Sequence, residues 1–250
     1  MRTLVIPYFE DNLAHLIQDG PDTLLIDAGD SEELLHALKD QGIALTHLLL
    51  THHHWDHIDG VRKVMNLYPG LKLYHPPFAN DLNEEGTTVH EGDKIPFGSG
   101  HVSIMATPFH TRTSICYLYQ GHIYTGDSLF VSGCGRMFEG RPKELFRAME
   151  RFRSLPPEML CHIGHDYATI NLRFAKMVEP KNPHLNSWTE QVKRIHETEG
   201  KLANTTIGQE LKTNPFLRIH EPDLIHYLDP DRVMTPVDRI GRLRELRNQF

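Results

Sequence analysis

The sequence is poor in cysteine: its 250 residues include only Cys116, Cys134 and Cys161. So few thiols, in an odd number, do not make a disulfide framework and favour a reducing compartment. An apolar run of about 20 residues, which a membrane-spanning helix needs, is missing, and the first residues do not resemble a secretory signal peptide. Positive charge is scarce too, because the formal net charge is −7. We therefore expect a cytoplasmic protein that contacts neither membrane nor nucleic acid.

The chain changes character near residue 166. Before that point, short strand patterns are interspersed with helix patterns; strands are predicted over 13–17, 23–26, 44–50, 102–106, 114–119, 122–125 and 159–163, and helices over 31–39 and 143–152. The remainder predicts helices over 170–177, 188–199 and 237–247, the second capped by Ser187. We therefore expect an α/β (α+β) domain over residues 1–166 and a helical domain over 167–250, with a hinge at Pro180–Pro183.

Histidine is abundant, with 18 in the chain, and four of these lie between Thr51 and His57 in the segment Thr-His-His-His-Trp-Asp-His. Imidazole and carboxylate are ligands for zinc and other divalent ions. In an extended backbone His52 and His54 point the same way and can share one metal, while Asp56 and the last histidine can bind a second. His53 should point away. A solvated histidine loop is the alternative, but the aspartate within the run and the buried strand before it argue against that.

Two metal sites need further ligands, and three candidates stand at the ends of predicted strands. They are His110, Asp127 and His165. Each one alone could be an ordinary core or turn residue, but their joint occurrence at strand ends favours a site. Asp127 is the natural bridge, because a carboxylate has two oxygens. The predicted metal ligands are therefore His52, His54, Asp56, His57, His110, Asp127 and His165.

The pattern His-x-His-x-Asp-His, followed by one His, one Asp and one His, resembles the metallo-β-lactamase superfamily. Further segments are similar to the hydroxyacylglutathione hydrolase (glyoxalase II) family: 126–130, 133–140, 164–167, 214–218 and the basic C-terminal end. The resemblance covers the whole chain and implies an αββα sandwich followed by a helical C-terminal domain. It also implies that one metal takes His52, His54 and His110, the other takes Asp56, His57 and His165, and Asp127 bridges them. We expect two Zn²⁺ ions, with iron or manganese as alternatives, since no thiolate is in the set.

The implied activity is hydrolysis of S-(2-hydroxyacyl)glutathione, typically S-D-lactoylglutathione, in the second step of methylglyoxal detoxification. Two divalent ions about 3.5–4 Å apart supply a hydroxide near neutral pH, so no Ser or Cys nucleophile is needed. Cys134 is therefore expected to be a small packed residue. Asp56 and Asp127 are the predicted catalytic residues, Asp56 by orienting the attacking water as well as binding metal. The thiolate leaving group has an ordinary pKa of about 8.5 and requires no strong general acid.

Glutathione is a net anion, so an acidic protein needs a local basic patch to bind it. Arg244 and Arg247 are three residues apart and share a helical face. From the residues alone this could be a solvated face. The family has a basic pair at these positions, which holds the glycine carboxylate, and the resemblance adds Arg136 and Tyr167 as further contacts. Phe138 stands where some members have Tyr, so a hydroxyl contact there is absent.

Several positions depart from the family pattern, among them Asp59, Phe109 and Asp166, and they leave the rate and the acyl preference open. The main competing activity is a mononuclear iron persulfide dioxygenase of the same superfamily that acts on glutathione persulfide. The long C-terminal part with its basic end argues against it. A lactonase or β-lactamase-like hydrolase and a non-catalytic metal-binding module are further alternatives. We expect a monomer whose partner is a small glutathione thioester.

Overall fold

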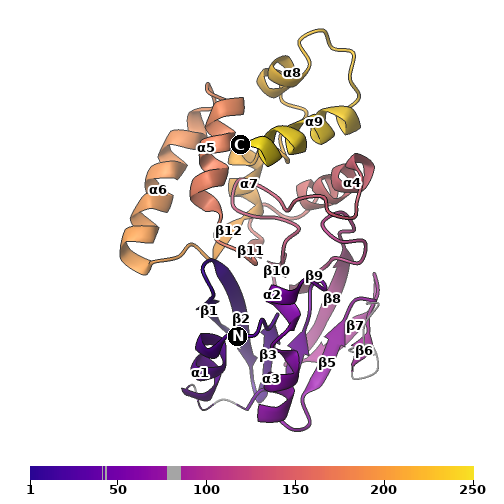
Figure 1. Ribbon diagram of the computed structural model, residues 1–250, viewed down its shortest axis with the longest axis vertical. Coiled ribbons are helices and arrows are strands. Elements are labelled where there is room, and N and C mark those ends of the chain that lie inside the picture. Colours follow the sequence, from indigo (N-terminus) through magenta and orange to yellow (C-terminus); the bar gives the residue numbers. More distant parts are fainter. Residues whose placement is uncertain (41, 43, 78–85) are drawn as a thin grey trace.

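The strands form two six-stranded sheets in the computed structural model, which describes residues 1–40, 42, 44–77 and 86–250 (Figure 1). The first sheet has the order β1-β2-β3-β4-β5-β6, from β1 (Arg2–Tyr8), β2 (Asn12–Asp19), β3 (Asp22–Ile26), β4 (His47–Leu49), β5 (Lys72–His75) and β6 (Thr87–Thr88). The second has the order β12-β11-β10-β9-β8-β7, from β7 (Lys94–Phe97), β8 (Gly100–Ala106), β9 (Ile115–Tyr119), β10 (His122–Tyr124), β11 (Leu160–His162) and β12 (Asn204–Thr206).

The two sheets pack face to face because apolar side chains alternate along their strands. Leu24 and Ile26 of β3 share a buried cluster with Ile115 and Tyr117 of β9. Leu25, between the first two, belongs instead to a cluster on the outer face of the first sheet. One strand therefore supplies both the layer between the sheets and the layer under the outer helices.

Helices cover both outer faces. The first sheet is covered by helices of the N-terminal part, namely α1 (Glu32–Asp40), α2 (Trp55–Ile58) and α3 (Val61–Leu67). The other helices gather at and beside the second sheet and are α4 (Pro142–Arg153), α5 (Ala168–Val178), α6 (Pro183–Glu199), α7 (Ile207–Thr213), α8 (Pro222–Leu228) and α9 (Pro236–Gln249) (Figure 1). This arrangement confirms the predicted αββα fold with a C-terminal helical part.

Two features of the C-terminal part differ from the sequence prediction. It is not entirely helical, because β12 pairs antiparallel with β11 and forms the edge of the second sheet. The predicted cap at Ser187 is wrong: α6 begins at Pro183, and the Asn182 side chain accepts a hydrogen bond from the His184 amide. Proline is favoured in the first helical turn, where its missing N–H costs nothing, so Pro183, the last residue of the predicted hinge segment, starts α6.

The sheet topology brings several loops to one edge of the sandwich. β3 and β4 run parallel, as do β10 and β11, while β8 and β10 flank β9 antiparallel to it. The chain segments that leave β3, β4, β8, β10 and β11 therefore open at the same ends of their sheets. Within the described ranges, no helix has the length and apolarity needed to cross a bilayer.

Candidate metal centre

The histidine-rich segment leaves β4 and turns directly into the short helix α2. Two glycines allow this helix to lie close against the loop after β3. A Cβ atom on Gly60 would lie 2.2 Å from the Gly29 carbonyl oxygen, and one on Gly29 would lie 2.3 Å from that of Asp56. The Tyr8 hydroxyl donates a hydrogen bond of 2.8 Å to the same Asp56 carbonyl. The backbone carrying the candidate ligands is thus fixed by close packing that larger residues would prevent.

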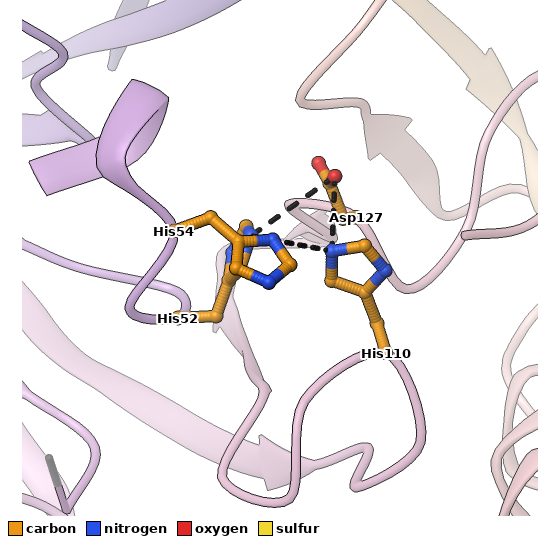
Figure 2. Close-up of side chains that lie close together, drawn as sticks. All are labelled: His52, His54, His110 and Asp127. Atoms are coloured by element: carbon orange, nitrogen blue, oxygen red, sulfur yellow. Dashed lines mark hydrogen bonds and ion pairs between the residues drawn. The ribbon is translucent and has the colours of Figure 1, made fainter. Parts of the chain in front are cut away.

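Three histidines and one aspartate form the first group of candidate ligands: His52, His54, His110 and Asp127 (Figure 2). The Nδ1 atom of His54 lies 3.2 Å from Nε2 of His52 and 2.9 Å from Nε2 of His110. One carboxylate oxygen of Asp127, Oδ2, lies 3.3 Å from the His110 nitrogen and 4.0 Å from that of His52. The side chains point toward one another from three separate loops.

The second group consists of Asp56, His57 and His165. The two Nε2 atoms lie 3.0 Å apart, and Oδ2 of Asp56 is 3.5 Å from His57 and 3.3 Å from His165. Oδ1 of Asp127 lies 3.4 Å from each of these imidazole nitrogens. The two oxygens of Asp127 therefore face different groups. The structure brings all seven predicted ligands together and places Asp127 between the two sets.

Carboxylates hold the far side of both imidazoles in the second group. The Nδ1 atom of His57 is 2.9 Å from Asp27, and that of His165 is 2.7 Å from Asp11. Asn12 donates a hydrogen bond of 2.9 Å to the Asp56 carboxylate. Such outer contacts fix the ring orientation of metal-binding histidines. The sequence prediction missed all three partners, although Asp27 carries the same signal as the ligands, a polar residue directly after a strand.

In the first group, different partners hold the buried imidazoles. Nδ1 of His110 lies 2.9 Å from the carbonyl oxygen of Arg136, and Nδ1 of His52 lies 3.0 Å from the Thr51 hydroxyl. Because a carbonyl only accepts, the proton of His110 resides on Nδ1 and leaves Nε2 as a lone-pair donor toward the centre. Arg136, predicted as a substrate contact, thus also orients a candidate ligand through its backbone.

The charges differ between the two groups. Burial lowers the pKa of His52 well below its ordinary value and that of His110 to about 4, so both are neutral at physiological pH. Burial acts in the same direction on His165, but the carboxylates of Asp127, Asp11 and Asp56 outweigh it and raise the pKa to about 9. The pKa of Asp127 lies well below its usual range, because the charges of His165 and His57 overcome the opposing effect of burial. The buried carboxylates of this centre therefore need positively charged groups beside them.

The donor set fits divalent cations. In the first group three imidazole nitrogens lie so close together that they cannot all carry a proton. Oδ1 of Asp127 is buried and accepts no hydrogen bond from the residues that the structure describes. Imidazole and carboxylate together suit zinc, iron and manganese. The residues therefore satisfy the chemistry of a two-cation site, with a buried carboxylate oxygen left over for a metal.

A pocket of about 290 Å³ opens beside the first group. His110 and Asp127 line its inner end, and the four residues predicted to bind substrate also line it: Arg136, Tyr167, Arg244 and Arg247. Among the described residues, neither Arg244 nor Arg247 pairs with a carboxylate. The pKa of Arg247 is lowered, mainly by burial and in addition by the positive charge of Arg244. A pocket lined by three arginines and two candidate ligands suits an anion that also reaches the metal centre.

The two C-terminal arginines differ in their contacts. Arg244 is only 5% exposed, and its guanidinium donates a hydrogen bond of 2.7 Å to the Cys134 carbonyl. Arg247 is more exposed and is oriented by the Asn171 side-chain oxygen, 3.1 Å from Nη2. Arg244 thus also holds the loop that leads to Arg136.

Cys134 lines the same pocket but has the character of a packed residue. It is buried, and burial raises the pKa of its thiol to about 11. A thiol rather than a thiolate is a poor nucleophile. This environment agrees with the prediction that Cys134 is not the nucleophile.

Comparisons with known protein families divide the chain into two matched parts. Residues 8–165 match the model of the metallo-beta-lactamase superfamily, and residues 166–250 match that of the hydroxyacylglutathione hydrolase C-terminus. A hydroxyacylglutathione hydrolase from Xanthomonas campestris pv. campestris is 36% identical over 227 residues, covering 90% of this chain and 88% of the relative. One from Vibrio cholerae is 34% identical over 247 residues, covering 98% of each.

Solved structures share the fold. ETHE1 from Myxococcus xanthus superposes with a TM-score of 0.66 at 24% identity, covering 99% of this chain and 98% of the other. TTHA1623 in a di-iron-bound form gives a TM-score of 0.61 at 25% identity, covering 87% and 100% of the two chains. The first likeness, at this identity, concerns the fold alone.

Proposed function

The chain belongs to the hydroxyacylglutathione hydrolase family of the metallo-β-lactamase superfamily, and we propose that it hydrolyses S-(2-hydroxyacyl)glutathione thioesters. The products are glutathione and a 2-hydroxy acid, and S-D-lactoylglutathione is the typical substrate. The observation that carries this proposal is a pocket lined by three arginines and by two of the seven candidate metal ligands, His110 and Asp127. One substrate can therefore bring its reacting carbonyl to the candidate ligands while its anionic tripeptide contacts the arginines.

We assign one cation to His52, His54 and His110, a second to Asp56, His57 and His165, and the bridge to Asp127. The converging distances within each group and the di-iron-bound form of TTHA1623 support two cations. Zinc is the first choice, and iron and manganese suit the same nitrogen and oxygen donors. Such ions, when bound, lower the pKa of a water toward neutrality and polarise the thioester carbonyl.

The chain's own residues bind and orient the substrate. Arg136, Arg244 and Arg247 hold the glutathione carboxylates by charge-assisted hydrogen bonds. Burial, reinforced by Asp11, raises the pKa of Tyr167, so its hydroxyl stays protonated and can donate a hydrogen bond to the thioester end. We assign to Asp56 the role of orienting the attacking water; the hydrogen bond that its carboxylate accepts from Asn12 supports this role.

We further propose a cytoplasmic monomer with a catalytic part over residues 1–166 and a substrate-binding part over 167–250. All seven candidate ligands and the four substrate residues come from one chain, so a second copy is not needed to complete the site. The three cysteines are buried and unpaired, which suits a reducing compartment. Light scattering of the purified protein tests the oligomeric state.

The activity is tested by following the loss of thioester absorbance from S-D-lactoylglutathione, with metal content measured on the same sample. We expect fast turnover that His54→Ala abolishes. Arg247→Ala should raise KM about 10-fold or more and change kcat little, because a hydrogen bond between charged groups contributes about 1.5–3 kcal/mol. Arg242→Ala is the matched control, since Arg242 is exposed on the same helix and does not line the pocket.

Binding of two ions per chain without thioester turnover would contradict the proposal. Oxygen uptake with glutathione persulfide, together with one iron per chain, would instead favour the dioxygenase alternative.

A further inference from the structure

His54 is held differently from the other imidazoles of the candidate metal centre. His52, His57, His110 and His165 each have a hydrogen-bond partner for the nitrogen that faces away from the centre. His54 directs Nδ1 to the centre, and in the part of the chain that the structure describes its Nε2 atom forms no hydrogen bond. The ring is also only half-buried. On the outer side of this ring, the described residues therefore offer ring packing in place of a hydrogen bond.

Besides the rings of the candidate ligands His52 and His110, two aromatic rings contact His54 edge to face. The Phe138 ring lies 5.3 Å from the His54 ring at 85°, and the His53 ring lies 5.4 Å from it at 79°. Phe138 also contacts His110, the neighbouring ligand, at 5.3 Å and 74°. This packing is the substitute for the missing hydrogen bond, because edge-to-face rings prefer a defined relative orientation.

Glu139 contacts one of these rings, His53, and follows the other, Phe138, directly in the chain. One of its carboxylate oxygens lies 3.3 Å from Nε2 of His53, and the other accepts a hydrogen bond of 2.7 Å from the Arg112 amide. The Phe138 amide donates a hydrogen bond of 3.2 Å to the His110 carbonyl. Glu139 thereby ties the histidine-rich loop to the loop of His110, and it keeps Phe138 between them.

Close backbone packing reinforces this arrangement. The Gly140 amide donates a hydrogen bond of 3.0 Å to the Phe109 carbonyl. A Cβ atom on Gly140 would lie 2.4 Å from the Phe109 Cα atom, so a larger residue would push the two loops apart. The short segment is thus held at both ends against the loop that carries His110.

We propose that Phe138 and Glu139 are positioning residues that set the orientation of His54 and hence the affinity of the first metal group. The inference rests on the ligand assignment proposed above. It gives His53 a role although it is not a candidate ligand, and it explains why a phenylalanine without a hydroxyl group is suited to position 138. The ring acts on the metal ligand, whereas the hydroxyl of a tyrosine there would act on the substrate.

Metal affinity in the absence of substrate tests the proposal. Metal-free protein is titrated with Zn²⁺ against a chelating dye, and His52→Ala identifies which of the two binding steps belongs to the first group. Phe138→Ala and Glu139→Ala should each weaken that step about 10-fold or more, the usual effect of losing a contact that orients a metal ligand, and leave the other step unchanged. Phe138→Tyr keeps the ring and should bind like wild type.

Two controls separate positioning from general damage. Phe9→Ala removes another exposed aromatic ring, which packs on Trp55 and not on a candidate ligand, and should change neither step. Thermal unfolding of the metal-free variants should match wild type, because the Phe138 side chain is 59% exposed.

Wild-type affinity for both ions in Phe138→Ala or in Glu139→Ala would overturn the role of that residue, even if the protein cleaves thioesters. Equal weakening of both steps would also overturn the proposal, since it assigns the effect to one group. A wild-type protein that binds no ion at the first group would overturn the ligand assignment and this inference together.

Discussion

The seven candidate ligands are not equivalent, because their outer contacts differ. Asp127 faces both groups with separate oxygens, whereas each remaining ligand serves one group. His57 and His165 are backed by carboxylates, and His110 is backed by a carbonyl. Carboxylate partners increase the basicity of an imidazole more than a neutral acceptor does. The second group should therefore bind its cation more tightly than the first.

The contact between Asp11 and His165 gives a prediction at the same scale. Asp11→Ala should weaken metal binding about 10- to 100-fold, because His165 loses the acceptor that fixes its ring. The free energy of unfolding of the metal-free protein should fall as well, because Asp11 supports the charged and buried His165 there. Zn²⁺ titration and chemical unfolding measure the two quantities. Glu10→Ala, the same change of charge one residue earlier, is the control, and equal affinities for both variants would contradict the prediction.

The candidate metal ligands were easier to predict from the sequence than the residues that contact them from outside. The ligands follow from a dense histidine motif and from polar residues that directly follow strands, both of which are local signals. Asp11 carries no such signal: it stands in a turn after β1 and reaches His165 only because the chain folds back over 154 residues. The hydrogen bond that the Arg136 carbonyl accepts from His110 is equally invisible, since a backbone carbonyl gives no sign in the sequence.

At the scale of elements, α9 is the helix that links the core to the pocket. Ile240 and Leu243 are buried in the cluster beneath the second sheet, while Arg244 and Arg247 line the pocket beside the candidate metal centre from the same helix. Its start is defined by a capping box in which Thr235 and Asp238 exchange hydrogen bonds with each other's backbone amides. The position of the arginines thus depends on how well the helix is formed.

Thr235→Ala removes the first half of this capping box. The free energy of unfolding should fall by about 1 kcal/mol, the usual cost of losing a threonine cap, with no loss of kcat, because the cap is far from the pocket end of α9. Urea unfolding and steady-state kinetics measure the two effects. Thr235→Ser keeps the hydroxyl and should restore stability; an equally destabilised serine variant would show that the methyl group, and not the cap, matters.

The helices were easier to predict than the short strands. The helix expected over 237–247 corresponds to α9, because its apolar residues recur at helical spacing over three turns. β12 has three residues, Asn204–Thr206, without an apolar alternation that could mark a strand. It is a strand because β11 offers an unpaired edge there, and that is a tertiary property.

For the whole molecule, the contact between the two sheets contains a polar cluster away from the metal centre. His15 of β2 lies against His162 of β11, with ring centroids 5.1 Å apart. Nε2 of His162 is 2.8 Å from Nδ1 of His122, and Nε2 of His15 is 2.9 Å from the Ile163 carbonyl. Burial lowers the pKa of His15 to about 4 and that of His162 to about 2, the latter further lowered by the other two histidines. The cluster is therefore neutral in the folded protein.

This neutrality should make stability depend on pH. An unfolded histidine has a pKa of about 6.5, so below that value the unfolded chain takes up protons that the folded chain does not. The free energy of unfolding that these histidines contribute has its full value above pH 7. It falls as the pH decreases toward 4, by up to about 1.4 kcal/mol per pH unit for each such histidine. His162→Gln should reduce the difference between the urea midpoints at pH 7.5 and pH 5.5, measured on metal-free protein. An unchanged difference would mean that other groups cause the effect.

The pairing of β12 with β11 also has a consequence for biosynthesis. The ribosome makes Leu160–His162 well before Asn204–Thr206, so the nascent chain carries β11 with one open edge while α5 and α6 are still being made. Open strand edges pair readily with other chains, and domains generally fold as they emerge from the ribosome. The second sheet can be completed only after the following helices have been translated. A premature stop near residue 166 would retain every candidate metal ligand and still leave a sheet edge exposed to aggregation.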